Sequence, residues 1–382
     1  MSTQTHAPIQ MVDTVGQYRH IQEEIDQAIL DVVRSGQYIN GPSVTAFRDH
    51  LAAYVEVPHT IPCANGTDAL QIALMALDLQ PGDEVITPTF TYVATVEVIA
   101  LLRLRPVFVD ADPLTFNLNP DLLESVITPR TKAIIPVHLF GQAADMAPVL
   151  AFAEKHGLHV VEDNAQAIGA RYHFADGRSV RTGSIGHIGC TSFYPSKNLG
   201  AYGDGGAIFT HDAALAERLW MICNHGSLRK YYHDSIGCNS RLDSIQAAIL
   251  DIKLRQLDTY TEARQWAAAR YDAGFAGIDG IEVPYRAPFS THVFHQYTLK
   301  VHGGRTRRDA LQHHLKDLGI PSMVYYPVPL HLQGAYRGYG YTEGQFPVAE
   351  QLTEEVISLP MHSELTEAQM DRIVRGVTEF EV

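Results

Sequence analysis

The sequence predicts an α/β protein: a large domain with a mainly parallel, mixed sheet flanked by helices, followed by a smaller α+β domain. Between residues 60 and 210, short β-rich runs alternate with segments of helical periodicity, which is typical of βαβ units and a parallel sheet. The chain has 382 residues, of which 46% are hydrophobic and 19% charged, and this suits a folded protein with two cores.

Four runs in the first half are predicted as strands of this sheet. They span residues 84–88, 106–110, 132–137 and 159–163. The carboxyl ends of parallel strands meet at one edge of an open α/β sheet, and ligands bind in the crevice at that edge. We therefore expect functional residues in the segments that follow these strands.

The second half of the chain predicts a helical link and a smaller unit. Residues 241–275 carry apolar side chains on one helical face and are predicted to join two domains, 1–250 and 251–382. Beyond the link, the pattern predicts a strand at 293–301, a helix at 305–318, an ordered loop at 327–344 and a terminal helix at 366–380.

Composition argues against several classes of protein. The net charge of −14 and the dispersed basic residues argue against a nucleic-acid partner. The stretch from Met1 to Met11 lacks the basic and apolar regions of a signal peptide, and no apolar run is long enough for a membrane span. The cysteines and histidines show no metal-ligand spacing, so we expect no metal site and a reducing, cytoplasmic setting.

Lys197 lies in a loop that a β-rich run leads into. Residues 190–206 read CTSFYPSKNLGAYGDGG, and the glycines let the backbone turn tightly after the lysine. A lone lysine in such a loop is more often a solvated side chain. The polar residues at the ends of nearby runs favour a chemical role for this one.

Asp163 ends a hydrophobic run that starts at Leu158, so it is predicted to lie at the carboxyl edge of the sheet. A buried carboxylate there would form a charge-assisted hydrogen bond with a protonated ring nitrogen. An N-cap for a following helix explains Asp163 equally well. Gln166, one turn later, can reach the same pocket.

A phosphate site is predicted where residues 65–70, NGTDAL, follow a β-rich run and lead into a helix at 69–77. The amides of Gly66 and Thr67 would lack helical partners and would face an anion. The hydroxyl of Ser192 can join them. This run matches neither a Walker loop nor a dinucleotide-binding fingerprint.

The cofactor pyridoxal 5′-phosphate (PLP) requires four groups in a protein site: an amine, a carboxylate, a phosphate cup and a flat group against its ring. Five motifs also occur in the order seen in the nucleotide-sugar aminotransferases of the aspartate-aminotransferase fold (PLP fold type I), which the chain resembles over nearly its whole length. They are NGTD at 65–68, PTFTY at 88–92, VEDNAQ at 161–166, SFYPSK at 192–197 and NSRLD at 239–243.

The resemblance implies a role for each of these residues. Lys197 would hold the aldehyde of the cofactor as a Schiff base, Asp163 would pair with the pyridine nitrogen, and Gln166 would contact the phenolic oxygen. Tyr92 would stack on the ring. The phosphate would be held by Gly66, Thr67 and Ser192.

The resemblance also implies a homodimer with shared active sites. Asn239 would reach the phosphate bound by the neighbouring subunit, which makes the dimer obligatory. The pair Asn239 and Ser240 also suits an N-cap before the apolar run that starts at Leu242, and both interpretations can hold together.

The substrate that the resemblance favours is UDP-linked 2-acetamido-3-keto-glucuronic acid, aminated at carbon 3 for cell-surface polysaccharide such as lipopolysaccharide, with L-glutamate as the amino donor. Arg241 of the partner subunit would bind the sugar carboxylate, since a guanidinium pairs with it in a bidentate way. Tyr325 replaces the histidine of the His-Tyr-Pro pattern of that group. Tyr325 and His331 are predicted to line the sugar pocket.

Three alternatives stand beside this substrate. Residues 136–142 and 228–234 also resemble dTDP-linked 3-keto-6-deoxyhexose 3-aminotransferases. Sugar dehydratases of the same fold replace the lysine by histidine, so Lys197 argues against them. A non-catalytic, sugar-binding relative would give a colourless protein, and the joint presence of lysine, aspartate and glutamine argues against it.

Overall fold

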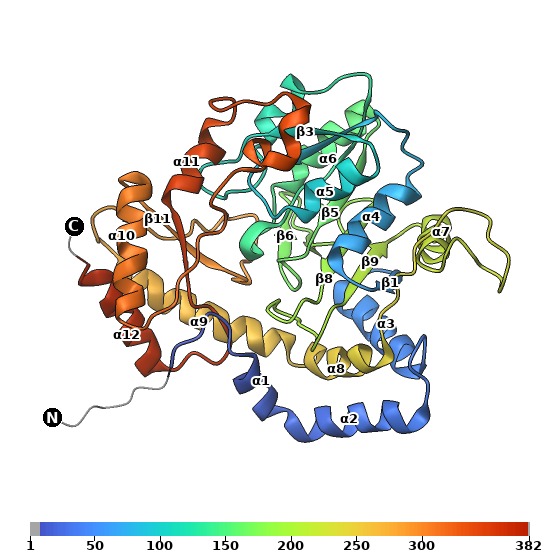
Figure 1. Ribbon diagram of the computed structural model, residues 1–382, viewed down its shortest axis with the longest axis horizontal. Coiled ribbons are helices and arrows are strands. Elements are labelled where there is room, and N and C mark those ends of the chain that lie inside the picture. Colours follow the sequence, from blue (N-terminus) through green and yellow to red (C-terminus); the bar gives the residue numbers. More distant parts are fainter. Residues whose placement is uncertain (1–7, 381–382) are drawn as a thin grey trace.

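A seven-stranded sheet forms the centre of the protein in the computed structural model, which describes residues 8–380 (Figure 1). The strand order is β1-β9-β8-β5-β4-β2-β3. Neighbours pair in parallel except β9, which runs antiparallel to β1 and β8, so the predicted mainly parallel, mixed sheet is confirmed. The strands are β1 His59–Cys63, β2 Glu84–Pro88, β3 Arg105–Val109, β4 Thr131–Ile134, β5 His159–Asp163, β8 Ile188–Ser192 and β9 Gly206–Thr210.

The four strands predicted from the sequence are present, with small shifts at their ends. Only the run at 132–137 is clearly shorter than predicted, because β4 stops at Ile134. Pro136 follows closely and has no amide hydrogen for the ladder. A separate antiparallel pair, β6 Arg171–His173 and β7 Ser179–Arg181, lies outside the main sheet.

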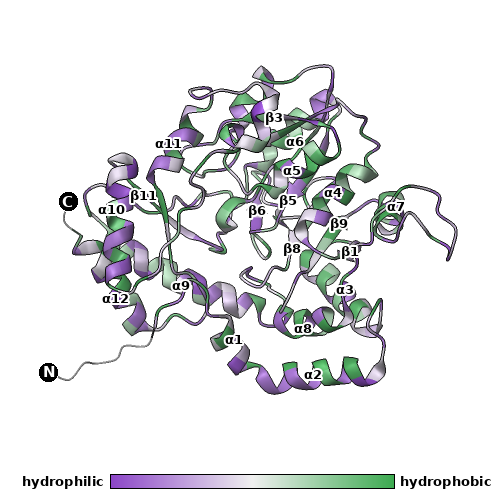
Figure 2. Cartoon of the chain, in the orientation of Figure 1, coloured by the Kyte–Doolittle hydropathy of each residue, from purple (hydrophilic) through white to green (hydrophobic). Residues whose placement is uncertain are grey.

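Helices cover both faces of the main sheet. One face carries α4, α5 and α7, and their apolar residues form one core with the strands. The other face carries α3, α6 and α8. Figure 2 shows the hydrophobic residues gathered on the strands and on the helices beside them. The bounds are α3 Pro42–Val55, α4 Gly66–Ala76, α5 Ala94–Leu101, α6 Met146–His156, α7 Ala213–Cys223 and α8 Ser244–Leu254.

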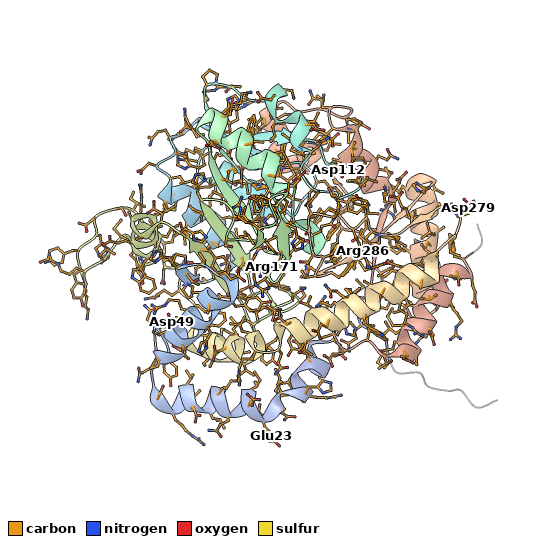
Figure 3. The ribbon with its side chains drawn as sticks, turned by 180° about the vertical axis from the view of Figure 1, so that it is seen from behind. Glu23, Asp49, Asp112, Arg171, Asp279 and Arg286 are labelled. Carbon is orange, nitrogen blue, oxygen red and sulfur yellow. The ribbon has the colours of Figure 1, made fainter. Side chains whose placement is uncertain are left out.

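The single helix predicted at 241–275 is wrong. The chain forms α8 and then α9 Leu257–Phe275, which Figure 3 shows end to end in yellow from behind. Leu250 and Leu254 pack in the core of the main sheet, whereas Tyr271 and Phe275 pack in a second core. A break between the helices lets the chain change direction from one core to the other.

The second core is built around a three-stranded antiparallel sheet. Its strands are β10 Ile281–Glu282, β11 Tyr297–Val301 and β12 Val356–Leu359, and its helices are α10 Gly304–Asp317, α11 Pro347–Glu355 and α12 Glu367–Thr378. The predicted strand at 293–301 therefore exists only in its second half. Thr366 and Gln369 form a capping box at the start of α12.

The N-terminal segment runs past both units. The helix α1 Thr14–His20 leads into α2 Gln22–Ser35, which lies along α8. Ile9 packs in the second core, and Met361 donates its amide to the Met11 carbonyl at 3.2 Å. The N-terminal segment therefore contributes to the second core, which is otherwise formed by the second half of the chain. The division at residue 250 stays a prediction.

Short 3-10 helices shape the loops of the larger unit and the segment at 327–344. They are η1 Pro120–Ser125, η2 Leu139–Gly141, η3 Leu330–Leu332 and η4 Gly334–Tyr339. Within residues 8–380, no helix is long and apolar enough to cross a bilayer, and no three metal-ligating side chains are grouped to hold an ion. The stretch assessed for a signal peptide, Met1 to Met11, lies mostly outside this range, since residues 1–7 are not described.

Candidate active site

The strand register brings three chain segments to one edge of the main sheet. Cys63 at the end of β1 and Ser192 at the end of β8 both lie opposite Gly206, and Asp163 at the end of β5 lies opposite Cys190. Gly206 allows this approach, because a Cβ there would lie 2.5 Å from the Asn65 carbonyl carbon. The segments predicted to hold phosphate, ring and amine therefore meet at the same edge.

The residues predicted to bind phosphate lie together where α4 meets β8. The helix begins at Gly66, one turn before the predicted start at 69, and Asn65 caps it by accepting the Asp68 amide at 2.8 Å. The amides of Gly66 and Thr67 lie in this first turn and have no partner within the helix. A Cβ at Gly66 would lie 2.6 Å from the Ser192 Cβ, so these two residues are in direct contact. The cradle would be filled by any larger side chain at Gly66.

Asp163 is a buried carboxylate with two donors from the chain. Its Oδ2 accepts the Thr95 hydroxyl at 2.7 Å and its Oδ1 accepts the Ala165 amide at 3.1 Å. The side chain is not a helix N-cap, because residues 165–169 form turns and no helix directly follows β5. The capping interpretation is therefore wrong, and the carboxylate keeps lone pairs that these two donors do not use.

Lys197 extends from a tight turn at the end of β8. Its amide donates to the Tyr194 carbonyl at 2.8 Å, and a Cβ at Gly200 would lie 2.4 Å from the Pro195 carbonyl oxygen. The amine forms no hydrogen bond with any residue in the range 8–380. Burial lowers the pKa of this amine to about 8, and the negative charge of Asp163 opposes the shift. The solvated-loop interpretation is therefore wrong, and about a tenth of the amine is neutral at pH 7, far more than for a lysine with the ordinary pKa.

The side-chain amide of Gln166 is held by two hydrogen bonds. Its Oε1 accepts the Phe140 amide at 2.8 Å, and its Nε2 donates to the Tyr326 hydroxyl at 3.1 Å. Tyr92 is 55% exposed, and its ring centroid lies 6.3 Å from that of Tyr326. An exposed aromatic face beside a buried amide suits a flat ligand between them.

Asn239 and Arg241 lie on the surface beside the phosphate site. Ser240 between them is buried and accepts the Ala64 amide at 3.1 Å, which ties this segment to the turn before α4. Asn239 is exposed, and Arg241 forms no ion pair with the residues that the structure describes. Ser240 is not a helix cap, since α8 begins at Ser244 after Asp243.

The loop that precedes Asn239 projects from the body of the protein, as Figures 1 and 3 both show after α7. Its apolar side chains are strongly exposed, with Tyr231 at 81% and Ile236 at 86%. Such side chains are normally covered when the protein assembles.

His331 does not reach the pocket in the way predicted. It is buried, its Nδ1 pairs with the Thr89 hydroxyl at 2.8 Å, and its Nε2 pairs with Glu350 at 3.1 Å. Both ring nitrogens are occupied, so no polar atom remains for a sugar. Tyr325 is partly buried next to Tyr326, and burial raises its pKa.

Two residues of the site escaped the sequence analysis. Thr95 holds Asp163, and Tyr326 holds Gln166. Thr95 gave a weak signal, since Thr91 and Thr95 are spaced to share one helical face while most of their neighbours are apolar. Tyr326 is adjacent to Tyr325, but nothing in the sequence indicates which of the two faces the amide.

A family model settles what this arrangement belongs to. The DegT/DnrJ/EryC1/StrS aminotransferase family matches residues 19–378. The chain is a member of this family. Its resemblance to the nucleotide-sugar aminotransferases is thereby confirmed over nearly the full length.

Curated relatives of similar length carry several names. The chain is 48% identical to the pleiotropic regulatory protein of Geobacillus stearothermophilus, over 97% of this chain and 98% of that protein. It is 47% identical to the UDP-2-acetamido-2-deoxy-3-oxo-D-glucuronate aminotransferase of Pseudomonas aeruginosa, over 97% and 99%. It is 44% identical to the dTDP-3-amino-3,4,6-trideoxy-alpha-D-glucose transaminase of Streptomyces venezuelae, over 100% and 98%.

Solved structures give the same fold. DesV of Streptomyces venezuelae superposes with a TM-score of 0.93 at 44% identity, covering 98% of each chain. A sugar aminotransferase of Streptococcus pneumoniae in its PLP form superposes with a TM-score of 0.87 at 28% identity, covering 94% of this chain and 95% of that one. The predicted aspartate-aminotransferase fold is confirmed.

This aminotransferase uses PLP, as its family does. The described residues fit the cofactor, since an unpaired, partly buried amine, a buried carboxylate and a glycine cradle for an anion lie at one sheet edge. The enzyme is a PLP-dependent sugar aminotransferase.

Proposed function

We propose that the enzyme transfers an amino group, supplied by L-glutamate, to carbon 3 of UDP-2-acetamido-3-keto-glucuronic acid for cell-surface polysaccharide. The observation that carries the choice of sugar is Arg241, a partly exposed guanidinium without an ion pair in residues 8–380. A planar guanidinium binds a carboxylate through two parallel hydrogen bonds. The name of the Pseudomonas aeruginosa relative supports the same sugar.

Each residue of the site has a proposed task. When bound, PLP supplies an aldehyde that accepts amino groups and a ring that withdraws electrons from the reacting carbon. Lys197 carries the cofactor and then takes and returns a proton at its Nζ, which a pKa of about 8 allows. Asp163 holds a proton at the ring nitrogen, while Gln166 contacts the phenolic oxygen.

The remaining residues hold the cofactor in place. Tyr92 covers one face of the ring, and the phosphate lies on Gly66, Thr67 and Ser192. Gln166 is held from both sides by Phe140 and Tyr326, so its amide cannot rotate freely. Proton transfer at the Nζ of Lys197 requires that the ring keep one orientation relative to this atom.

We further propose that the active unit is a homodimer in which Asn239 and Arg241 serve the site of the partner. The projecting loop before Asn239 supplies apolar side chains for such an interface. Mixing inactive Lys197→Ala chains with inactive Asn239→Ala chains should restore roughly a quarter of the activity, because half of the dimers are hybrids with one intact site of two. No recovery despite demonstrated subunit exchange would contradict shared sites.

The sugar is tested by Arg241→Lys. The variant should lose about 10- to 100-fold in kcat/KM on the uronic acid, because an ammonium cannot replace the bidentate pair. It should scarcely change on a dTDP-linked 3-keto-6-deoxyhexose, which has a methyl group in place of the carboxylate. Equal losses on both substrates would assign Arg241 to the nucleotide phosphates or the interface instead.

A second candidate substrate is the dTDP-linked 3-keto-6-deoxyhexose itself. The 44% identity to the Streptomyces venezuelae transaminase over the whole chain favours it. Wild-type enzyme that prefers this sugar over the uronic acid in the same experiment would establish it.

A further inference from the structure

Thr95 lies at the start of α5, and its side chain leaves its own helix. It is fully buried, and its hydroxyl donates to Asp163 Oδ2 at 2.7 Å. As the second residue of α5, Thr95 has no residue of its own helix three or four positions earlier whose carbonyl its hydroxyl could bond. Here the hydroxyl instead crosses to the end of β5, where it meets a carboxylate.

This contact is the single side-chain hydrogen bond that Asp163 receives from residues 8–380. The other carboxylate oxygen takes the Ala165 amide at 3.1 Å. Thr95 has one proton and gives it to Asp163, so the Thr91 hydroxyl at 3.4 Å can interact with Thr95 only as a donor. The result is a short buried chain from Thr91 through Thr95 to Asp163, in which each bond polarises the next.

Tyr92, which directly follows Thr91, is proposed to belong to the same site. Tyr92 is exposed, with its ring near that of Tyr326, while Thr91 and Thr95 are buried. One short segment therefore supplies both the proposed cover of the ring and the group that holds the carboxylate facing its nitrogen. A shift of the α5 start would disturb both contacts together.

We propose that Thr95 is a positioning residue whose hydroxyl fixes the Asp163 carboxylate in the orientation that binds the cofactor ring. This inference rests on the proposed role of Asp163. Thr95 itself touches neither substrate nor cofactor. Its removal should weaken PLP binding without damaging the fold, because valine has nearly the same shape as threonine.

The test measures the PLP dissociation constant of the apoenzyme for a set of variants. Thr95→Val should weaken binding about 10- to 100-fold, the range for loss of a hydrogen bond to a charged group. Thr95→Ala removes the same hydroxyl without crowding and should agree with it. Thr95→Ser keeps the hydroxyl and should bind within about 3-fold of wild type. Thr91→Val, one bond further away, should lose less than Thr95→Val.

A double-mutant cycle separates this inference from the proposed function. Asp163→Ala should itself weaken PLP binding strongly, and adding Thr95→Val to it should cause no further loss. If Asp163→Ala binds PLP normally, the role of Asp163 is wrong and the inference falls with it. If Asp163→Ala is weak while Thr95→Val and Thr95→Ala both bind like wild type, only the inference is wrong. Thermal unfolding of each apo form shows whether the fold is retained.

Discussion

Burial lowers the pKa of two lysines of this enzyme, the partly buried Lys197 and the buried Lys253, but only one of the two amines has a partner. Lys197 follows β8, and Lys253 lies on α8 with 1% of its surface exposed. Burial lowers the pKa of both amines, to about 8 for Lys197 and to about 7 for Lys253, where nearby Arg264 adds to the shift. Lys253 donates to the Gly200 carbonyl and lies 5.1 Å from the Tyr202 ring centroid, whereas the amine of Lys197 has no partner in residues 8–380.

The comparison shows that burial alone does not make a reactive amine. Lys253 has the lower pKa, yet a carbonyl and an aromatic face already occupy it. Gly200 is three residues after Lys197, so Lys253 secures the turn from which Lys197 extends. Lys197 keeps an unpaired amine beside the Asp163 charge, and we assign the chemistry to it.

Replacing Lys197 should produce the largest effect. Lys197→Ala should lower kcat about 1000-fold or more, since one residue is proposed both to carry the cofactor and to move the proton. The folded state should not weaken, because a buried amine without a partner is removed. Turnover and the thermal unfolding midpoint measure the two effects. A variant with ordinary transamination would remove the central assignment.

Replacing Lys253 should have a smaller effect of a different kind. Lys253→Met keeps the volume and removes the buried charge, so the unfolding midpoint should stay within about 2 °C of wild type or rise. The turn at Gly200 loses its donor, so kcat should fall about 3- to 10-fold while the cofactor remains bound. A loss as large as that of Lys197→Ala would erase the distinction between the two lysines.

The smallest effect is on the pH dependence of stability. In the unfolded chain both amines hold their protons up to about pH 10.5, whereas the folded chain releases them near pH 8 and pH 7. The unfolded state therefore binds more protons in this range, and stability rises with pH from about 7 to about 10.5. Lys253→Met should show a shallower rise in the unfolding midpoint of the apo form between about pH 7 and pH 10. An unchanged slope would mean that the Lys253 amine is charged at these pH values.

The sequence predicted the elements whose pattern is local. The strands at 84–88 and 159–163 appear with those bounds, because β-branched runs between helical segments have few other ways to pair. The positions of Lys197 after a strand and of Gly66 at a helix start were predicted, because strand-to-loop transitions and helix starts are visible in the chain; their roles stay a proposal. Asp163 was found as a strand end, and only the absence of a following helix excluded a cap.

Contacts between distant segments could not be predicted in this way. The break after Leu254 depends on which core each turn of helix meets. His331 was assigned to the sugar because its loop is aromatic, and its partners Thr89 and Glu350 lie 242 and 19 residues away. Thr95 holds Asp163 across 68 residues of sequence, and no local pattern records such a pairing.

The most direct measurement locates the cofactor on one of the two lysines. The PLP form is reduced with borohydride, which fixes a lysine-bound cofactor permanently, then digested and analysed by peptide mass spectrometry. The cofactor mass should appear on the peptide that contains Lys197 and be absent from the peptide that contains Lys253. The Lys197→Ala protein, treated in parallel, should show no labelled peptide. Label on Lys253, or on the Lys197→Ala chain to the same extent as wild type, would contradict the assignment of Lys197.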